Sequence, residues 1–121
     1  YDEKSQVVIP VNPALFEWVI ENVCKNAIDA MEGIGEIKII VSGTEKHVLI
    51  DIHDTGRGIP KRSFKKIFTP GYTTKKRGWG LGLSLARRIV EEFHQGRIYV
   101  RSSEEAKGSC IRIMMNKDAG K

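Results

Sequence analysis

The 121-residue sequence has few cysteines and histidines and no long apolar run, and each shortage excludes a class of protein. No stretch approaches the about 18 apolar residues that span a membrane, and none resembles a signal peptide. Cys24 and Cys110 form no CxxC pair, which predicts two reduced core cysteines and a cytoplasmic location. His47, His53 and His94 lack the spacing of metal ligands, so each is expected to be structural or exposed.

Aromatic residues are also sparse, at 7% of the sequence, and this limits how its positive charge is interpreted. The net charge is +5 and the pI is near 9.3, with basic residues gathered at 61–66, 75–77 and 87–88. Nucleic-acid binding would call for an aromatic platform or a reading helix among them, and neither pattern is present. We therefore expect no nucleic-acid partner. A bound anion of nucleotide size explains one basic cluster, and the others are expected to be solvated surface.

The length of the chain fits one domain, residues 1–121, with a single two-layer core. The first residue is Tyr1 rather than Met, so we expect a fragment of a longer protein. Any membrane anchor or sensor segment of that parent protein would then lie outside this sequence.

Hydrophobic periodicity and turn residues predict strands and helices in the order β-α-β-β-α-loop-α-β-β. The expected strands are 6–11, 36–43, 47–54, 97–103 and 109–115, and the expected helices are 14–31, 61–68 and 81–95. Asn12 is expected to cap the first of these helices, with Pro13 at its first helical position. Adjacent strands followed by helices are typical of an α+β fold. We predict a two-layer α/β sandwich with a mixed, mostly antiparallel sheet and helices on one face.

The first long helix carries two asparagines, Asn22 and Asn26, which the four-residue spacing places on one face. Asparagine weakens a helix interior slightly, so two asparagines on one face indicate a role other than helix formation. An amide oxygen suits a magnesium ion that keeps most of its waters and shares phosphate oxygens. The alternative is that both are exposed polar residues.

The strand HVLIDIH is followed by DTGRGIP, residues 54–60. The Asp54 carboxylate, at the strand end, can accept a hydrogen bond from an exocyclic amine such as that of adenine. Gly56 and Gly58 let backbone approach a flat ring, since no Cβ intervenes. A plain Asp-Gly turn is the alternative.

Three further glycines, Gly78, Gly80 and Gly82, open directly into a leucine-rich helix. A helix N-terminus exposes free N–H groups and a partial positive charge, so it can receive phosphate. The pattern is neither GxxxxGK[ST] nor GxGxxG, and alone it is a weak signal.

Taken in order, these segments resemble the ATP-binding catalytic domain of two-component sensor histidine kinases, within the wider family shared with Hsp90, gyrase B and MutL. FEWVIENVCKNAIDAM resembles the N box, DTGRGIP the G1 box, FKKIFTPGYTTK the F box and GWGLGLSLARRIVEEFHQG the G2 box with its trailing helix. The resemblance covers nearly the whole chain.

The resemblance implies a site for ATP and Mg²⁺. It makes Asn26 the magnesium ligand, with Asn22 and Asn26 as the catalytic residues, and it directs Asp54 to the adenine amine. Phe68 and Tyr72 would anchor a small lid over the nucleotide. The implied nucleotide contacts are Asn22, Asn26, Asp54, Gly56, Gly58, Ile59, Phe68, Tyr72, Thr73, Thr74, Lys75, Lys76, Arg77, Gly78, Gly80, Leu81, Gly82 and Leu83.

The sequence departs from the family pattern at several positions. Related ATPases usually carry glutamate where this chain has Asn22, and an amide cannot take a proton from water, which favours transfer over hydrolysis. Glu21 is adjacent but points elsewhere on the helix. Trp79 replaces a small residue and Gly71 an aromatic one. HQG stands where HGG is usual, a change expected to be harmless.

The resemblance implies that the intact protein transfers the γ-phosphoryl group of ATP to a histidine on a separate dimerisation domain, for two-component signalling. The further implied partner is the receiver domain of a response regulator, and a membrane would be involved only through parental segments. None of the three histidines here lies in a phosphoacceptor context. The alternatives are an anti-sigma-type serine protein kinase and a degenerate nucleotide-binding module that only docks partners.

Overall fold

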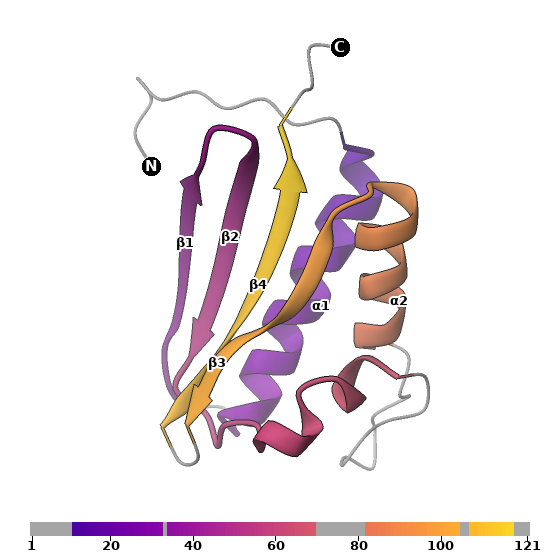
Figure 1. The fold of residues 1–121 in the computed structure, drawn as a ribbon. Coiled ribbons are helices and arrows are strands. Elements are labelled where there is room, and N and C mark those ends of the chain that lie inside the picture. The colour runs from indigo at the N-terminus through magenta and orange to yellow at the C-terminus, as the bar shows by residue number, and fades with distance from the viewer. Residues whose placement is uncertain (1–10, 33, 70–81, 105–106, 118–121) are drawn as a thin grey trace.

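The computed structural model describes residues 11–32, 34–69, 82–104 and 107–117, and it forms two layers (Figure 1). The helical elements are α1 (Pro13–Ala30), η1 (Lys61–Ser63), η2 (Lys66–Phe68), α2 (Gly82–Arg88) and η3 (Ile89–Phe93). The strands are β1 (Ile37–Gly43), β2 (His47–Asp54), β3 (Arg97–Glu104) and β4 (Gly108–Asn116). None of the described helices has the length and apolarity that crossing a bilayer requires.

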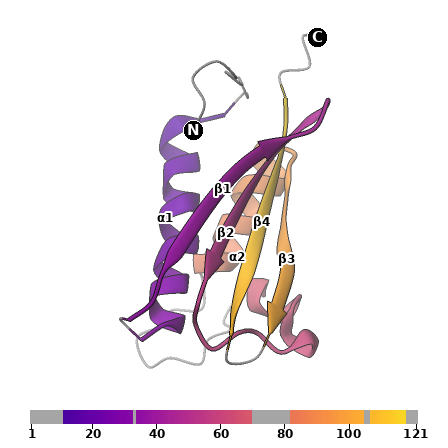
Figure 2. The same cartoon turned by 90° about the vertical axis from the view of Figure 1, so that its left-hand side faces the viewer.

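The four strands form one sheet in the order β1-β2-β4-β3, in which two hairpins meet at the β2–β4 pair. Figure 2 shows the sheet in front and α2 behind it, and the described helices lie on one face of the sheet. This confirms the predicted α+β sandwich. The sheet was predicted to be mixed and mostly antiparallel, and the three described pairings are all antiparallel. The predicted strand at 6–11 lies outside the described residues except for Val11.

Helix α1 begins where the sequence predicted, because Asn12 and Pro13 form its start. The Asn12 side chain accepts a hydrogen bond from the Leu15 backbone N–H at 3.1 Å, and Pro13 occupies the first helical position, where its missing N–H costs nothing. Val19, Val23 and Ala27, four residues apart, form the buried stripe.

The core lies between this stripe and the alternate residues of the central strands. The buried members are Val19, Val23, Val48, Ile50, Ile52, Ile67, Phe68, Ala86, Ile89, Val90, Ile98, Val100, Ile111, Ile113 and Met115. Because β2 and β4 contribute every second residue, the intervening residues lie on the opposite, helix-free face.

The trailing helix, predicted as one element over 81–95, is split into α2 and a π-helical turn, η3. His94 fastens its end to α1: its Nε2 accepts the Asn12 N–H at 2.9 Å, and its Nδ1 lies 2.9 Å from the Ile89 carbonyl oxygen. The first contact requires an unprotonated Nε2, so Nδ1 carries the proton and donates it. His94 is therefore structural, as predicted.

Gln95 adopts a left-handed backbone with φ of 57°. The middle residue of HQG thus occupies a conformation that favours glycine, and the substitution is not free of cost, contrary to the expectation from sequence.

We expect Gln95→Gly to raise the free energy of unfolding by about 1 kcal/mol, because glycine removes the Cβ strain of this conformation. Urea unfolding measures the change. Glu92→Gly, at an exposed helical residue, is the matched control and should destabilise by a similar amount. A Gln95→Gly variant as unstable as Glu92→Gly would contradict the assignment of strain.

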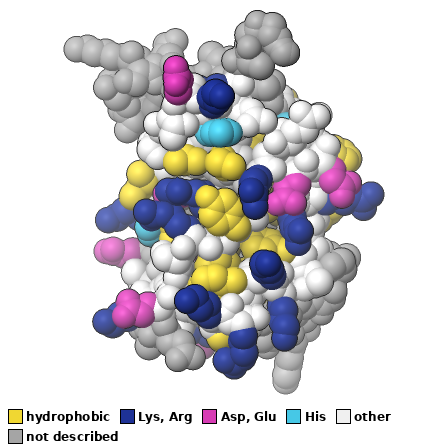
Figure 3. All heavy atoms as spheres, viewed as in Figure 1, with side chains coloured by type: hydrophobic (Ala, Val, Ile, Leu, Met, Phe, Trp, Pro, Cys, Tyr) yellow, Lys and Arg dark blue, Asp and Glu magenta, His cyan; other side chains and the backbone are white. Residues whose placement is uncertain are grey.

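The surface carries many cations. Figure 3 shows Lys and Arg side chains spread over one view of the molecule, with apolar and uncharged atoms between them. Such a distribution agrees with solvated surface charge.

Candidate functional site

The candidate site is built at the end of β2, where Asp54 leads into the glycine-bearing loop. Asp54 is buried, on the helix-covered face, and both of its oxygens are held. Oδ1 accepts the Gly56 backbone N–H and Oδ2 accepts the Ser109 hydroxyl, each at 2.8 Å. A carboxylate has about four lone-pair sites, so each oxygen can accept one further bond in a fixed direction.

The loop after Asp54 lies directly against the end of α1. A Cβ on Gly56 would come within 2.7 Å of the Ala30 carbonyl oxygen, and that same oxygen accepts the Arg57 N–H at 3.3 Å. Gly58 has φ of 83°, which glycine adopts without strain. The two glycines are therefore required by the local backbone, and their joint effect is to hold Asp54 close to α1.

Beyond Gly58, the loop is tied to the β3–β4 hairpin. The Ile59 N–H donates to the Ser103 hydroxyl at 2.6 Å, and this hydroxyl donates to the Gly108 carbonyl at 3.2 Å. Ile59 is half-buried against the core. The floor of the site thus joins three parts of the chain: the end of α1, the loop and the hairpin.

Asn22 and Asn26 are both half-buried on the same side of α1, and Glu21 is exposed, as predicted. The Asn22 Nδ2 donates to the Trp18 carbonyl at 3.0 Å, and a Cβ on Gly82 would lie 2.9 Å from Asn22 Oδ1. Asn22 therefore lies against the start of α2. Within the described residues, no hydrogen bond joins the Asn26 side chain to another residue.

The remaining described candidates, Phe68 and Leu83, belong to the hydrophobic core or pack against it. Phe68 is 5% exposed and belongs to the core, and Leu83 packs against that core from α2. The other predicted residues lie outside the described part of the chain: Tyr72, Thr73, Thr74, Lys75, Lys76, Arg77, Gly78, Gly80 and Leu81, together with Gly71 and Trp79.

Ser109 was missed by the sequence reasoning. It is buried, lies opposite Asp54 in the β2–β4 register, and holds the carboxylate by its hydroxyl. The two residues are 55 positions apart, so no local spacing connects them. The one available signal was a hydroxyl residue at the start of an otherwise apolar strand.

Two surface cavities differ in their relation to this site. The larger, about 410 Å³, lies at the start of α1 between Leu15 and Phe93, whereas the site is at the end of α1. The smaller, about 230 Å³, is lined by residues that include Asp54, Ser109 and Gly108. The larger cavity is lined by none of the residues that hold Asp54, so the smaller one belongs to the candidate site.

Comparison with known proteins matches residues 12–119 to the histidine kinase-, DNA gyrase B- and HSP90-like ATPase family. Sporulation kinase E of Bacillus subtilis is 41% identical over 104 residues, which are 85% of this chain and 14% of that protein. The sensor histidine kinase ZraS of Escherichia coli K12 is 38% identical over 107 residues, 88% of this chain and 23% of that protein. The chain thus spans less than a quarter of these relatives.

A solved structure of the catalytic domain of histidine kinase ThkA has the same fold. Its TM-score is 0.79 at 32% identity, over 90% of this chain and 71% of that one. ThkA has also been solved in complex with the response regulator TrrA, and that chain gives a TM-score of 0.70 at 32% identity, over 85% of this chain and 28% of that one.

Proposed function

Because the chain belongs to the histidine kinase-, DNA gyrase B- and HSP90-like ATPase family, we propose that it binds Mg·ATP and supplies the γ-phosphoryl group to a histidine on a separate dimerisation domain of its parent protein. The observation that carries this proposal is the buried Asp54 carboxylate, fixed by Gly56 and Ser109 at the end of a strand.

Asp54 is suited to recognise adenine. Its oxygens are oriented before any ligand arrives, and the amine of adenine can donate to a lone pair that neither Gly56 nor Ser109 uses. Guanine presents a carbonyl oxygen at the corresponding ring position, which a carboxylate repels. The residue therefore selects the base as well as binding it.

The asparagines of α1 fit the phosphate end of the same ligand. The Asn26 oxygen is a hard neutral donor that accepts no hydrogen bond from the described residues, and such an oxygen suits a partly hydrated Mg²⁺. When bound with ATP, Mg²⁺ would neutralise phosphate charge during transfer. Phe68 and Leu83 support the adjoining backbone through the core, and Lys75, Lys76 and Arg77 are proposed to meet the phosphate tail.

Asn22 favours transfer to an external acceptor over hydrolysis. Its Nδ2 already donates to Trp18, and an amide oxygen is too weak a base to activate water. Catalysis by this chain then consists mainly of positioning ATP and stabilising its charge. His94 is not a suitable acceptor, because both of its ring nitrogens are engaged with the backbone.

The similarity to sensor histidine kinases supports a place in two-component signalling. The ThkA relative was solved with a response regulator, so we propose a receiver domain as the downstream partner of the parent protein. We place the domain in the cytoplasm, where ATP is available, with any membrane anchor contributed by other parts of the parent.

Transfer of label from γ-³²P-ATP to the separately supplied dimerisation domain tests the proposal. Phosphohistidine is labile in acid and phosphoserine is stable, so the label should disappear on acid treatment. An acid-stable label would favour the anti-sigma-type serine kinase. Absence of both transfer and nucleotide binding would favour a docking module.

Asn26→Ala should lower the rate of this transfer by at least about 100-fold, since the missing oxygen would leave the metal ion poorly held against the phosphates. Lys25→Ala, at the exposed neighbouring residue, is the matched control and should transfer at the wild-type rate. Equal rates for the two variants would remove Asn26 from the metal site.

A further inference from the structure

On the helix-free face of the sheet, directly behind the nucleotide site, three potential metal ligands meet. Asp51, His53 and Cys110 each offer one ligand atom, and these atoms lie within 4.8 Å of one another. His53 is paired with Cys110 in the β2–β4 register, and the next pair is Asp54 with Ser109. Residues alternate between faces along a strand, so the cluster and Asp54 lie back to back across the same two strands.

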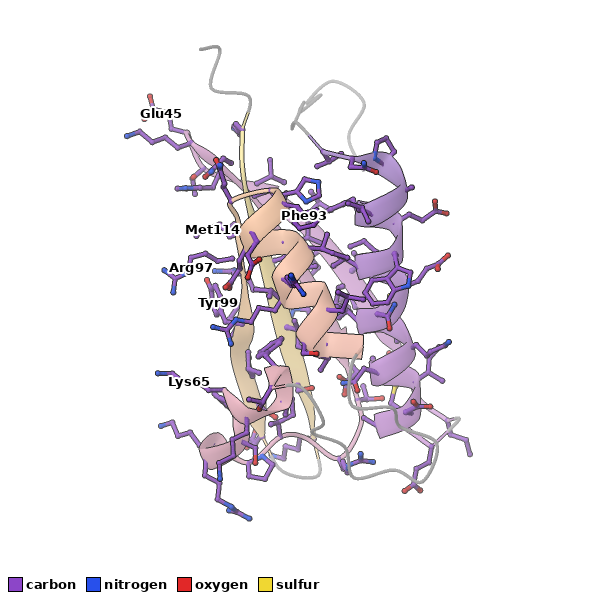
Figure 4. The ribbon with its side chains drawn as sticks, turned by 90° about the vertical axis from the view of Figure 1, so that its right-hand side faces the viewer. Glu45, Lys65, Phe93, Arg97, Tyr99 and Met114 are labelled. Atoms are coloured by element: carbon purple, nitrogen blue, oxygen red, sulfur yellow. The ribbon has the colours of Figure 1, made fainter. Side chains whose placement is uncertain are left out.

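The arrangement is part of a polar face. Asp51 pairs with Arg112, and Arg112 pairs with Tyr99 of β3, so these side chains share the helix-free face with the cluster. Figure 4 shows Arg97, Tyr99 and Met114 of this face pointing away from the helices.

The contact between Cys110 and His53 has the dimensions of a metal site. Cys110 Sγ lies 3.6 Å from His53 Nε2. Two ligands of a tetrahedral Zn²⁺, with bonds of about 2.3 Å to sulfur and about 2.0 Å to nitrogen, lie about 3.5 Å apart. A thiolate with an imidazole is also a ligand pair that selects zinc over magnesium or calcium.

Asp51 can complete this pair without losing its ion pair. The Arg112 Nε and Nη2 donate to its Oδ1 and Oδ2 at 2.7 and 2.8 Å, and each oxygen retains a second lone pair. The hydrogen bonds from Arg112 lower the pKa of Asp51. In this arrangement Arg112 orients the ligand, as groups behind metal ligands commonly do.

Charge and access decide whether an ion can enter. Zinc binds the thiolate form of cysteine, so the thiol proton of Cys110 must leave as the metal binds. The resulting thiolate and the Asp51 carboxylate supply two negative charges. Two neighbouring cations, Arg112 at 2.7 Å and Arg101 at 4.0 Å from Asp51, offset part of their attraction for Zn²⁺. Access is available because both His53 and Cys110 line the cavity of about 230 Å³ at the hairpin end.

We propose that Asp51, His53 and Cys110 form a zinc site on the outer face of the sheet, with water as the fourth ligand. The site goes beyond the nucleotide function and does not depend on it. His53 was predicted to be structural or exposed rather than a ligand, since it lacks the spacing of metal ligands. It lies 57 residues from Cys110, and only the strand pairing brings the two together.

Titration of the 121-residue chain, without affinity tag or nucleotide, with Co²⁺ and then Zn²⁺ tests the site. We expect one Co²⁺ per chain, a near-ultraviolet charge-transfer band from the Cys110 thiolate, and loss of that band when Zn²⁺ displaces cobalt. Absence of the band, or a cobalt spectrum typical of oxygen ligands only, would overturn the proposal.

The variants assign the ligands. Cys110→Ser and His53→Asn should each weaken Zn²⁺ binding by at least about 100-fold, and Asp51→Asn by about 10-fold, because zinc depends most on its sulfur and nitrogen ligands. Cys24→Ser, at the other free cysteine, is the matched control and should bind as wild type. Circular dichroism checks that each variant is folded. If Cys110→Ser does not fold, His53→Asn still tests the site, because it keeps both thiols. Undiminished Zn²⁺ binding by folded Cys110→Ser or by folded His53→Asn would show that the cysteine–histidine contact is a hydrogen bond only.

Discussion

Asp54→Ala should lower the affinity for ATP by at least about 100-fold. A hydrogen bond to a charged group contributes about 1.5–3 kcal/mol, and each 1.4 kcal/mol is a factor of ten in affinity. The substitution removes the proposed hydrogen bond to adenine and also frees the Gly56 N–H and the Ser109 hydroxyl, which Asp54 now holds at 2.8 Å. The loop that would carry the base is loosened together with the loss of that proposed contact. Calorimetric titration measures the affinity.

A matched control and a second nucleotide sharpen this experiment. Glu36→Ala removes an exposed carboxylate near the same end of the sheet and should bind ATP as wild type. Wild type should also bind ATP far more tightly than GTP, and Asp54→Ala should lose that preference. Wild-type affinity in Asp54→Ala would mean that the base is bound elsewhere.

Gly108→Ala should destabilise the domain by about 3–5 kcal/mol, a large part of the 5–15 kcal/mol typical of a small domain. Gly108 has φ of 123°, and a Cβ there would lie 2.0 Å from the Asp54 carbonyl oxygen. That oxygen belongs to a central strand and cannot move away without breaking the β2–β4 pairing. The midpoint of urea unfolding measures the loss.

Gly43→Ala is the matched control for this second variant. It is a glycine at the end of β1, where a Cβ would meet the His47 carbonyl oxygen at 3.3 Å, and a small adjustment relieves that contact. We expect a cost below about 1 kcal/mol. If Gly108→Ala unfolded at the same urea concentration as Gly43→Ala, the close approach to Asp54 could not be a property of the folded protein.

Local patterns were sufficient to predict most of the fold. Asn12 and Pro13 place the start of α1 correctly, and the strand over 47–54 has the predicted bounds, because capping and alternation act between near neighbours. The π-helical turn after Arg88 was not predicted, since apolar residues recur at nearly the same spacing in a π-helical turn as in an α-helix. The glutamine of HQG was expected to be harmless, whereas Gln95 has a left-handed backbone. That conformation depends on how the chain turns toward β3, which the sequence around it does not show.

The candidate site was predictable only where its chemistry is local. Asp54, Gly56 and Gly58 are adjacent in the sequence, and Asn22 and Asn26 share a helix face. Ser109 and the contact of His53 with Cys110 depend on how β4 pairs with β2, and register is determined by the packing of whole strands. No spacing within a single segment could reveal them.

The most direct test of the central claim is calorimetric titration of ATP into the wild-type chain with and without Mg²⁺. The account predicts one site per chain, tighter binding when Mg²⁺ is present, loss of that Mg²⁺ effect in Asn26→Ala, and loss of binding under both conditions in Asp54→Ala. Negligible binding by folded wild-type protein, with and without Mg²⁺, would contradict it.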